Sequence, residues 1–111
     1  MSKVERPPGF LYAFPKLGGA IEELVGAGDI KERLRAAAMI LAPIFPDDFP
    51  EPLRGEYASL HEALTWVPPE AGSSQGLLGA TIDAMSEDEA AELATRLLLV
   101  YMDAAEIYYR R

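Results

Sequence analysis

The pattern of apolar positions at the end of the chain predicts one long helix from Ser86 to Arg111. Ser86 and Glu89 form a capping-box sequence, which is typical of a helix start. Apolar residues then recur at steps of three and four in two adjacent stripes. The first stripe contains Ala90, Leu93, Leu97, Tyr101, Ala104 and Tyr108, and the second contains Leu98, Met102, Ala105 and Tyr109. Together they exceed the roughly 100° apolar arc of an ordinary surface helix, so we expect a central helix or one shared with another chain.

The same periodicity predicts further helices upstream. The first is short, from Leu17 or Gly19 to Val25, and the second is capped by Asp29, with an apolar stripe that continues to Ile44. The third helix follows the proline-rich connector 45–52 and extends to about residue 66. The fourth is short, begins after a cap at Ser73 or Ser74, and places Leu78, Ile82 and Met85 on one side. No alternating strand pattern is present, which favours an all-α protein.

The first fifteen residues differ from the rest because Pro7, Pro8, Gly9 and Pro15 surround four large apolar side chains. Proline lacks a backbone donor and fixes φ, so the pattern predicts that residues 1–15 form an extended N-terminal arm. Residues 16–111 are then a single helical-bundle domain. The predicted fold is an all-α bundle of four principal helices, with a short N-terminal helix and an extended proline and aromatic arm.

Composition supports one globular domain. The chain has 111 residues, of which 50% are hydrophobic and 25% charged, and this balance argues against disorder. The absence of cysteine excludes disulfides, thiolate metal sites and cysteine nucleophiles. Neither a signal-peptide pattern nor an apolar run of the roughly 18 residues needed to cross a bilayer is present. We therefore expect a cytoplasmic protein without membrane contact.

Negative charge is concentrated in the second half of the chain. Residues 1–55 carry eight acidic and seven basic residues, for a net charge of −1, whereas residues 56–111 carry ten and three, for −7. A strongly acidic surface repels phosphate backbones, which argues against direct nucleic-acid binding. It suits a basic protein partner, or solubility alone.

No sequence motif for catalysis, cofactor binding or metal binding is present. His61 is the one histidine, and Ala58 occupies the position where a di-iron bundle would need glutamate. The acidic runs lack the ligand spacing of an EF-hand, and no serine lies in a nucleophile elbow. The glycine-rich turns match neither a P-loop nor a dinucleotide-binding motif. We therefore predict no catalytic, cofactor or metal residues.

The sequence favours a function in protein binding. Residues of types enriched at interfaces lie outside the main stripes of the third and last helices: Trp66, Leu98, Leu99, Met102 and Tyr109. The expected function is that of an acidic protein-interaction module, such as an adaptor, inhibitor or immunity-like regulator, that also forms a homodimer through its last helix. Two alternatives remain open. One is an enzyme or metal-binding protein that uses buried carboxylates near His61, and the other is an acidic DNA mimic.

Overall fold

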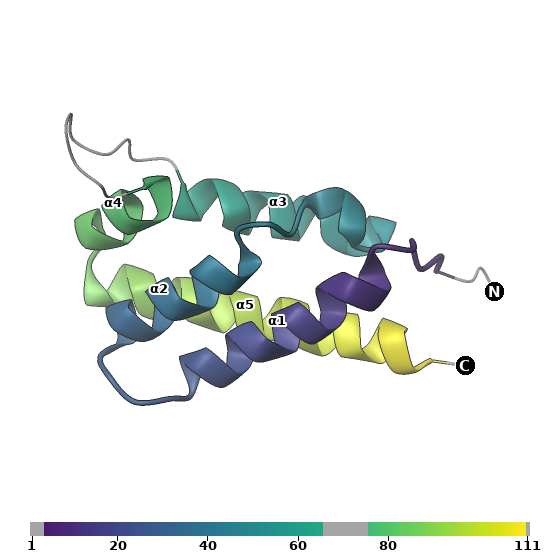
Figure 1. Cartoon of the computed structure of the whole chain (residues 1–111), viewed down its shortest axis with the longest axis horizontal. Helices are drawn as coiled ribbons and strands as arrows, with labels where there is room; N and C mark the ends of the chain where they lie inside the picture. Colours follow the sequence, from purple (N-terminus) through teal and green to yellow (C-terminus); the bar gives the residue numbers. More distant parts are fainter. Residues whose placement is uncertain (1–3, 66–75, 111) are drawn as a thin grey trace.

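The protein is an all-α bundle, seen here in a computed structural model that describes residues 4–65 and 76–110 (Figure 1). The described elements are five α-helices and one short 3-10 helix. In chain order they are α1 (Phe10–Leu24), α2 (Ile30–Leu41), η1 (Pro46–Asp48), α3 (Glu51–Leu64), α4 (Leu77–Ala84) and α5 (Glu87–Tyr109). The bundle is elongated, with extents of 50 × 27 × 20 Å.

Helix α5 runs along the length of the bundle and contacts α1, α2 and α3. Figure 1 shows α1 and α5 side by side and antiparallel, so that the start of α1 lies beside the end of α5. The guanidinium of Arg6 donates a hydrogen bond of 3.0 Å to the carbonyl of Tyr108, which joins the two ends of the described chain. The last helix is therefore central to the fold, as its width of apolar surface predicts.

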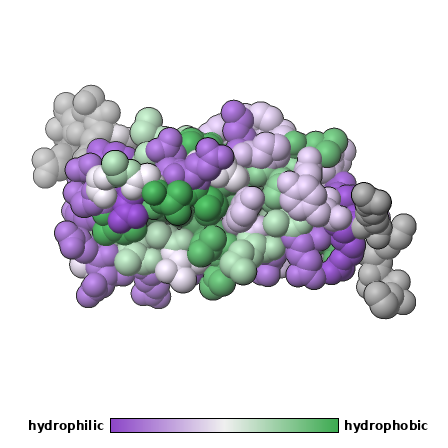
Figure 2. Space-filling model, turned by 90° about the horizontal axis from the view of Figure 1, so that it is seen from below, coloured by the Kyte–Doolittle hydropathy of each residue, from purple (hydrophilic) through white to green (hydrophobic). Residues whose placement is uncertain are grey.

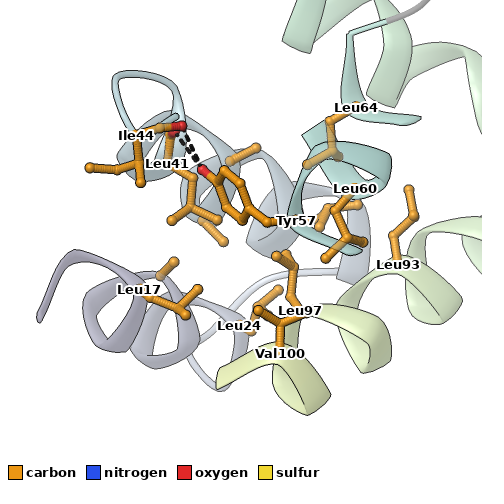
Figure 3. Close-up of a cluster of buried hydrophobic side chains, with 14 of the residues drawn as sticks. Leu17, Leu24, Leu41, Ile44, Tyr57, Leu60, Leu64, Leu93, Leu97 and Val100 are labelled. Atoms are coloured by element: carbon orange, nitrogen blue, oxygen red, sulfur yellow. Dashed lines mark hydrogen bonds between the residues drawn. The ribbon is translucent and has the colours of Figure 1, made fainter. Parts of the chain in front are cut away.

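The core is built from leucine and aromatic side chains of every long helix. Figure 3 shows Leu17 and Leu24 of α1 facing Leu60 of α3 and Leu97 of α5. Tyr57 is buried within this cluster, and its hydroxyl donates to the carbonyls of Leu41, at 3.2 Å, and Ile44, at 2.8 Å. The Leu41 carbonyl, in the last turn of α2, also accepts from the backbone N–H of Ile44 at 2.9 Å, so Tyr57 fixes the turn that ends this helix. Burial raises the pKa of Tyr57 well above its usual value, so the hydroxyl stays a donor.

The prediction of an extended arm over residues 1–15 is wrong from Phe10 onward. Helix α1 begins at Phe10 and continues without a break to Leu24, so the predicted short helix is only its second half. The described part of the arm is limited to residues 4–9. The apolar residues of this stretch recur at helical spacing and are buried: Phe10, Ala13, Phe14, Leu17, Ala20 and Leu24. Their burial outweighs the cost of Pro15, which is roughly 3 kcal/mol inside a helix.

Replacing Pro15 by alanine should stabilise the protein. Pro15 is exposed on α1 and cannot donate to the carbonyl of Leu11, one turn earlier. Alanine restores this hydrogen bond and removes the ring clash, while it increases the entropy of the unfolded chain. The expected net gain is about 1 to 2 kcal/mol in the free energy of unfolding, measured by urea denaturation. An unchanged or lower stability would contradict the inclusion of Pro15 in a continuous helix.

The predicted helix caps at Asp29 and Ser86 are confirmed. The carboxylate of Asp29 accepts from the backbone N–H of Glu32 at 2.9 Å. In the capping box of α5, the Ser86 hydroxyl accepts from the N–H of Glu89 at 3.0 Å, and the Glu89 carboxylate accepts from the N–H of Ser86 at 2.9 Å. These bonds lower the pKa of Asp29 and the pKa of Glu89 below their usual values.

The Glu89 carboxylate makes α5 sensitive to acid. Because the N–H of Ser86 lowers the pKa of Glu89, its contribution to stability is full above the ordinary value of 4.5 and is lost as the pH falls through the lowered value. We expect Glu89→Gln to have a lower Tm than the unchanged protein at neutral pH. The difference should shrink once the pH is below the lowered pKa of Glu89, because both side chains are then neutral. Thermal melts at several pH values test this, and a pH-independent difference would contradict it.

The other predicted helices are present in the structure, but their first and last residues differ from the prediction. Helix α2 stops at Leu41, before Pro43, and Ile44 is buried in the turn that follows rather than in the helix. Ile82 in α4 and Met85 at its C-cap are buried as predicted. The N-cap of α4 is Gly76, while the side chain of Leu78 and the residues proposed as caps, Ser73 and Ser74, lie outside the described residues. Among the described helices, none combines the length and apolar character needed to cross a membrane.

Candidate functional site

The first apolar stripe of α5 faces the bundle as predicted. Ala90, Leu93, Leu97 and Ala104 are buried, and Tyr101 and Tyr108 are partly buried against the core. Val100, which neither predicted stripe includes, is also buried. On a helical wheel Val100 lies beside Leu97 and Ala104, so a wider first stripe would have included it.

The second apolar stripe of α5 is exposed on the described chain. Leu98 is 43% exposed, Met102 57% and Tyr109 70%. At 100° per residue these three side chains point within about 40° of one another, so they form one strip along the helix. Ala105 lies beside this strip and is partly buried. No described element covers the strip.

An aromatic contact joins this part of α5 to α1. The ring of Phe14 stacks on Tyr101, with centroids 5.4 Å apart, and on Tyr108, with centroids 4.3 Å apart. Tyr109 meets the same ring edge-on at 5.7 Å. At Gly18, one turn further along α1, a β-carbon would lie 3.6 Å from the Tyr101 ring, an ordinary contact distance. The flank of α1 that contains Phe14 and Gly18 therefore lies directly beside the exposed strip.

Two further exposed apolar residues lie on this flank of α1. Leu11 is 71% exposed and Val25 is 77% exposed, and each is seven residues from Gly18, which places all three on one side of the helix. We call the surface formed by Leu11, Val25, Leu98, Met102 and Tyr109 the α1–α5 face. Figure 2 views the side of the bundle on which α1 and α5 lie, and shows hydrophobic residues gathered near its middle between hydrophilic ends.

The sequence did not identify the contribution of α1 to this face. Leu11 falls in the stretch that was predicted to be an extended arm, and Val25 was treated as the end of a short helix. The available signal was the seven-residue spacing of Leu11, Gly18 and Val25, which only has meaning once the whole segment is helical.

Two of the predicted interface residues do not join the α1–α5 face. Leu99 is 54% exposed but points about 80° away from the strip, towards the side of α5 that carries Glu92 and Asp103. Trp66 lies outside the described residues, so its prediction stays untested.

Negative charge is concentrated on the same two helices. Within their bounds, α1 carries Glu22 and Glu23 against Lys16, and α5 carries six acidic residues against Arg96. Eight acids and two bases give the pair a net charge of −6, compared with −8 for the whole chain. All eight acidic side chains are exposed. Helix α2, by contrast, carries Lys31, Arg33 and Arg35 against Glu32, for a net charge of +2.

A narrow apolar crevice lies beside His61, between α2, α3 and α5. Its volume is about 10 Å³, and it is lined by Ala38, Leu41, Ala42, Tyr57, Leu60, His61, Leu64 and Leu97. The alternative of buried carboxylates acting near His61 requires at least two acidic groups here, and none lines this crevice. In the described segments, no group of three or more histidine, aspartate or glutamate side chains is placed to hold a metal ion.

The DNA-mimic alternative requires a regular row of carboxylates on an exposed face of the last two helices. Helix α4 contributes Asp83, whose carboxylate pairs with Arg35 of α2. On α5 the acidic residues of the first two turns are followed by Thr95, Leu98 and Leu99 before Asp103. The row is therefore interrupted by apolar side chains at the middle of the helix, where the α1–α5 face is most continuous.

An open hollow adjoins the α1–α5 face at the start of α1. It has a volume of about 600 Å³ and is lined by Arg6, Pro7, Pro8, Phe10, Leu11 and Tyr108. Apart from Arg6 and the tyrosine hydroxyl, this lining consists of proline, leucine and aromatic rings. The hollow can thus receive a bulky apolar group at one end of the face.

Comparison of the chain with protein-family models, with curated protein sequences and with solved structures finds no match.

Proposed function

We propose that this chain is a protein-interaction module that binds a protein partner through the α1–α5 face. One observation carries the proposal: five large apolar side chains, from two adjacent helices, are exposed on one side of a bundle whose core is otherwise closed. Contiguous apolar surface of this kind, bordered by charged residues, is characteristic of binding sites rather than of inert surface. A protein that acts by binding a partner, and not by catalysis, fits the role of an adaptor, inhibitor or immunity-like regulator.

Self-association is the other use of the same face that the sequence suggested. A homodimer through α5 would cover Leu98 and Met102 with their counterparts in a second copy. Sedimentation equilibrium over a range of concentrations distinguishes the two uses. A dimer that dissociates when Leu98 and Met102 are replaced by glutamine supports self-association, whereas a monomer at high micromolar concentration leaves the face to another protein.

Paired affinity captures test the proposed function. The unchanged chain and the Leu98→Gln, Met102→Gln double variant are used as baits, and retained proteins are identified by mass spectrometry. Met39→Gln is the matched control, because Met39 is 65% exposed on α2, which does not contribute to the face. We expect at least one protein to be retained by the unchanged chain and by the control, and lost by the double variant. Retention that is the same for all three baits would overturn the proposal.

A further inference from the structure

We infer that the partner presents a cationic amphipathic helix to the α1–α5 face. This inference rests on the proposed function and names the chemistry of the partner. By a cationic amphipathic helix we mean one with apolar residues along one side and lysine or arginine along its edges. Such helices bind by laying the apolar side into a hydrophobic groove, with anchors at steps of three, four and seven residues.

The dimensions of the face fit one helix. The apolar positions of α1 extend from Leu11 to Val25, which corresponds to about 21 Å at 1.5 Å per residue. A partner helix of about 14 residues has the same length. Midway along, Gly18 packs against the ring of Tyr101, which joins the α1 side of the face to the α5 side. The hollow beside Leu11 and Tyr108 then accepts one large apolar side chain at the end of the bound helix.

The charge along the edges of the face selects a cationic partner. On the α1 side, Glu22 lies about 40° around the helix from Gly18. On the α5 side, Asp88 and Glu106 lie about 60° around the helix from the middle of the exposed strip. In the described part of the chain, Glu106 is the one of the eight acids on these helices that is in an ion pair, with Arg110 at 2.6 Å. Lysine or arginine at the edges of a bound helix would meet these carboxylates, which speeds association and fixes orientation.

The same charge disfavours a second copy of the chain as the occupant. Two faces brought together would place the edge carboxylates of Glu22 and Asp88 against those of the other copy, and this repulsion opposes the apolar contact. Two of the arginines in the described part of the chain are already paired within the bundle. Arg96 turns towards α3, where it pairs with Glu56 at 3.0 Å, and Arg35 of α2 pairs with Asp83 of α4. A partner that supplies positive charge avoids this cost.

Synthetic peptides test the inference with the full chain. The probe is a fluorescently labelled 16-residue peptide with leucine at helical spacing and lysine at the edge positions. One comparison peptide has glutamate in place of lysine, and another has the same composition as the probe in a scrambled order. We expect the lysine peptide to bind at least about tenfold more tightly than either comparison, with an affinity that falls as salt rises from about 50 to 300 mM.

Two double variants, each with a control, locate the binding site. Leu98→Gln with Met102→Gln should weaken binding of the lysine peptide about tenfold, and Met39→Gln should leave it unchanged. Glu22→Gln with Asp88→Asn should weaken it about fivefold and reduce its dependence on salt. The matched control is Glu51→Gln with Glu62→Gln, which makes the same change in net charge on exposed residues of α3. Circular dichroism verifies that each variant is folded.

Three results would overturn the inference. They are equal binding of the lysine and glutamate peptides, equal weakening by the α3 control pair, and a dimer that depends on Leu98 and Met102. Its failure is distinguishable from failure of the proposed function. If capture of a protein depends on the face while the lysine peptide does not bind, the inference fails and the proposed function stands. If no captured protein depends on the face, the proposed function fails as well.

Discussion

Replacing Phe14 by alanine is expected to destabilise the protein by about 3 to 5 kcal/mol. Phe14 is 4% exposed, and its ring contacts Phe10 together with three tyrosines of α5. Truncation removes the transfer free energy of the ring and leaves a cavity between rigid aromatic groups that cannot close. Alanine has the higher helix propensity of the two residues, so a loss of stability reports tertiary packing and not the local preference of α1.

Tyr12→Ala is the matched control for this change. Tyr12 is an aromatic residue of the same helix, 54% exposed, and the ammonium of Lys16 lies 5.6 Å from its ring centre. Its removal should cost less than about 1 kcal/mol. Urea denaturation followed by circular dichroism gives both free energies of unfolding. Equal effects of the two substitutions would contradict the inward direction of Phe14 and, with it, the pairing of α1 with α5.

Replacing Leu97 by alanine should cost about 2 to 5 kcal/mol. Leu97 is fully buried at the centre of the bundle, where it meets side chains of α1 and α3 (Figure 3). It also forms part of the wall of the crevice beside His61. Because a crevice already exists there, truncation enlarges a space that the surrounding helices do not fill, which places the cost towards the upper part of the range.

The next residue, Leu98, provides a control for the effect of Leu97→Ala on stability. Leu98→Ala makes the same chemical change one position later, but Leu98 is 43% exposed on the α1–α5 face. We expect a loss below about 1 kcal/mol, measured by the same urea denaturation. A variant with nearly unchanged stability is also the one that is useful in binding studies. If Leu98→Ala were as destabilising as Leu97→Ala, the exposed strip of α5 would instead be part of the core.

Local sequence signals predicted the second half of the fold well. Hydrogen bonds of the kind made by Asp29, Ser86 and Glu89 involve residues three positions apart, so they are visible in the sequence. The first stripe of α5 was equally clear because it extends over about five turns, from Ala90 to Tyr108. These features depend on short-range chemistry, and tertiary contacts do not have to be known to identify them.

Helix α1 could not be identified in the same way. Pro15 is a strong local signal against a helix, and it is overcome by contacts with residues more than eighty positions away in the sequence, such as Tyr101 and Tyr108. The same long-range pairing creates the α1–α5 face. The sequence therefore predicted the exposed strip of α5, while the half of the face contributed by Leu11 and Val25 appears only when the two helices are placed side by side.

The hydrogen bond between Arg6 and the carbonyl of Tyr108 has a practical consequence for attaching anything to this molecule. Chain that precedes Arg6 and chain that follows Tyr108 leave the bundle from one end, next to the hollow. A tag or surface tether at either position crowds that end of the α1–α5 face. Immobilisation through a residue that replaces Ala27, in the turn at the opposite end of α1, keeps the hollow accessible to a peptide, and places the tether beside Val25 instead.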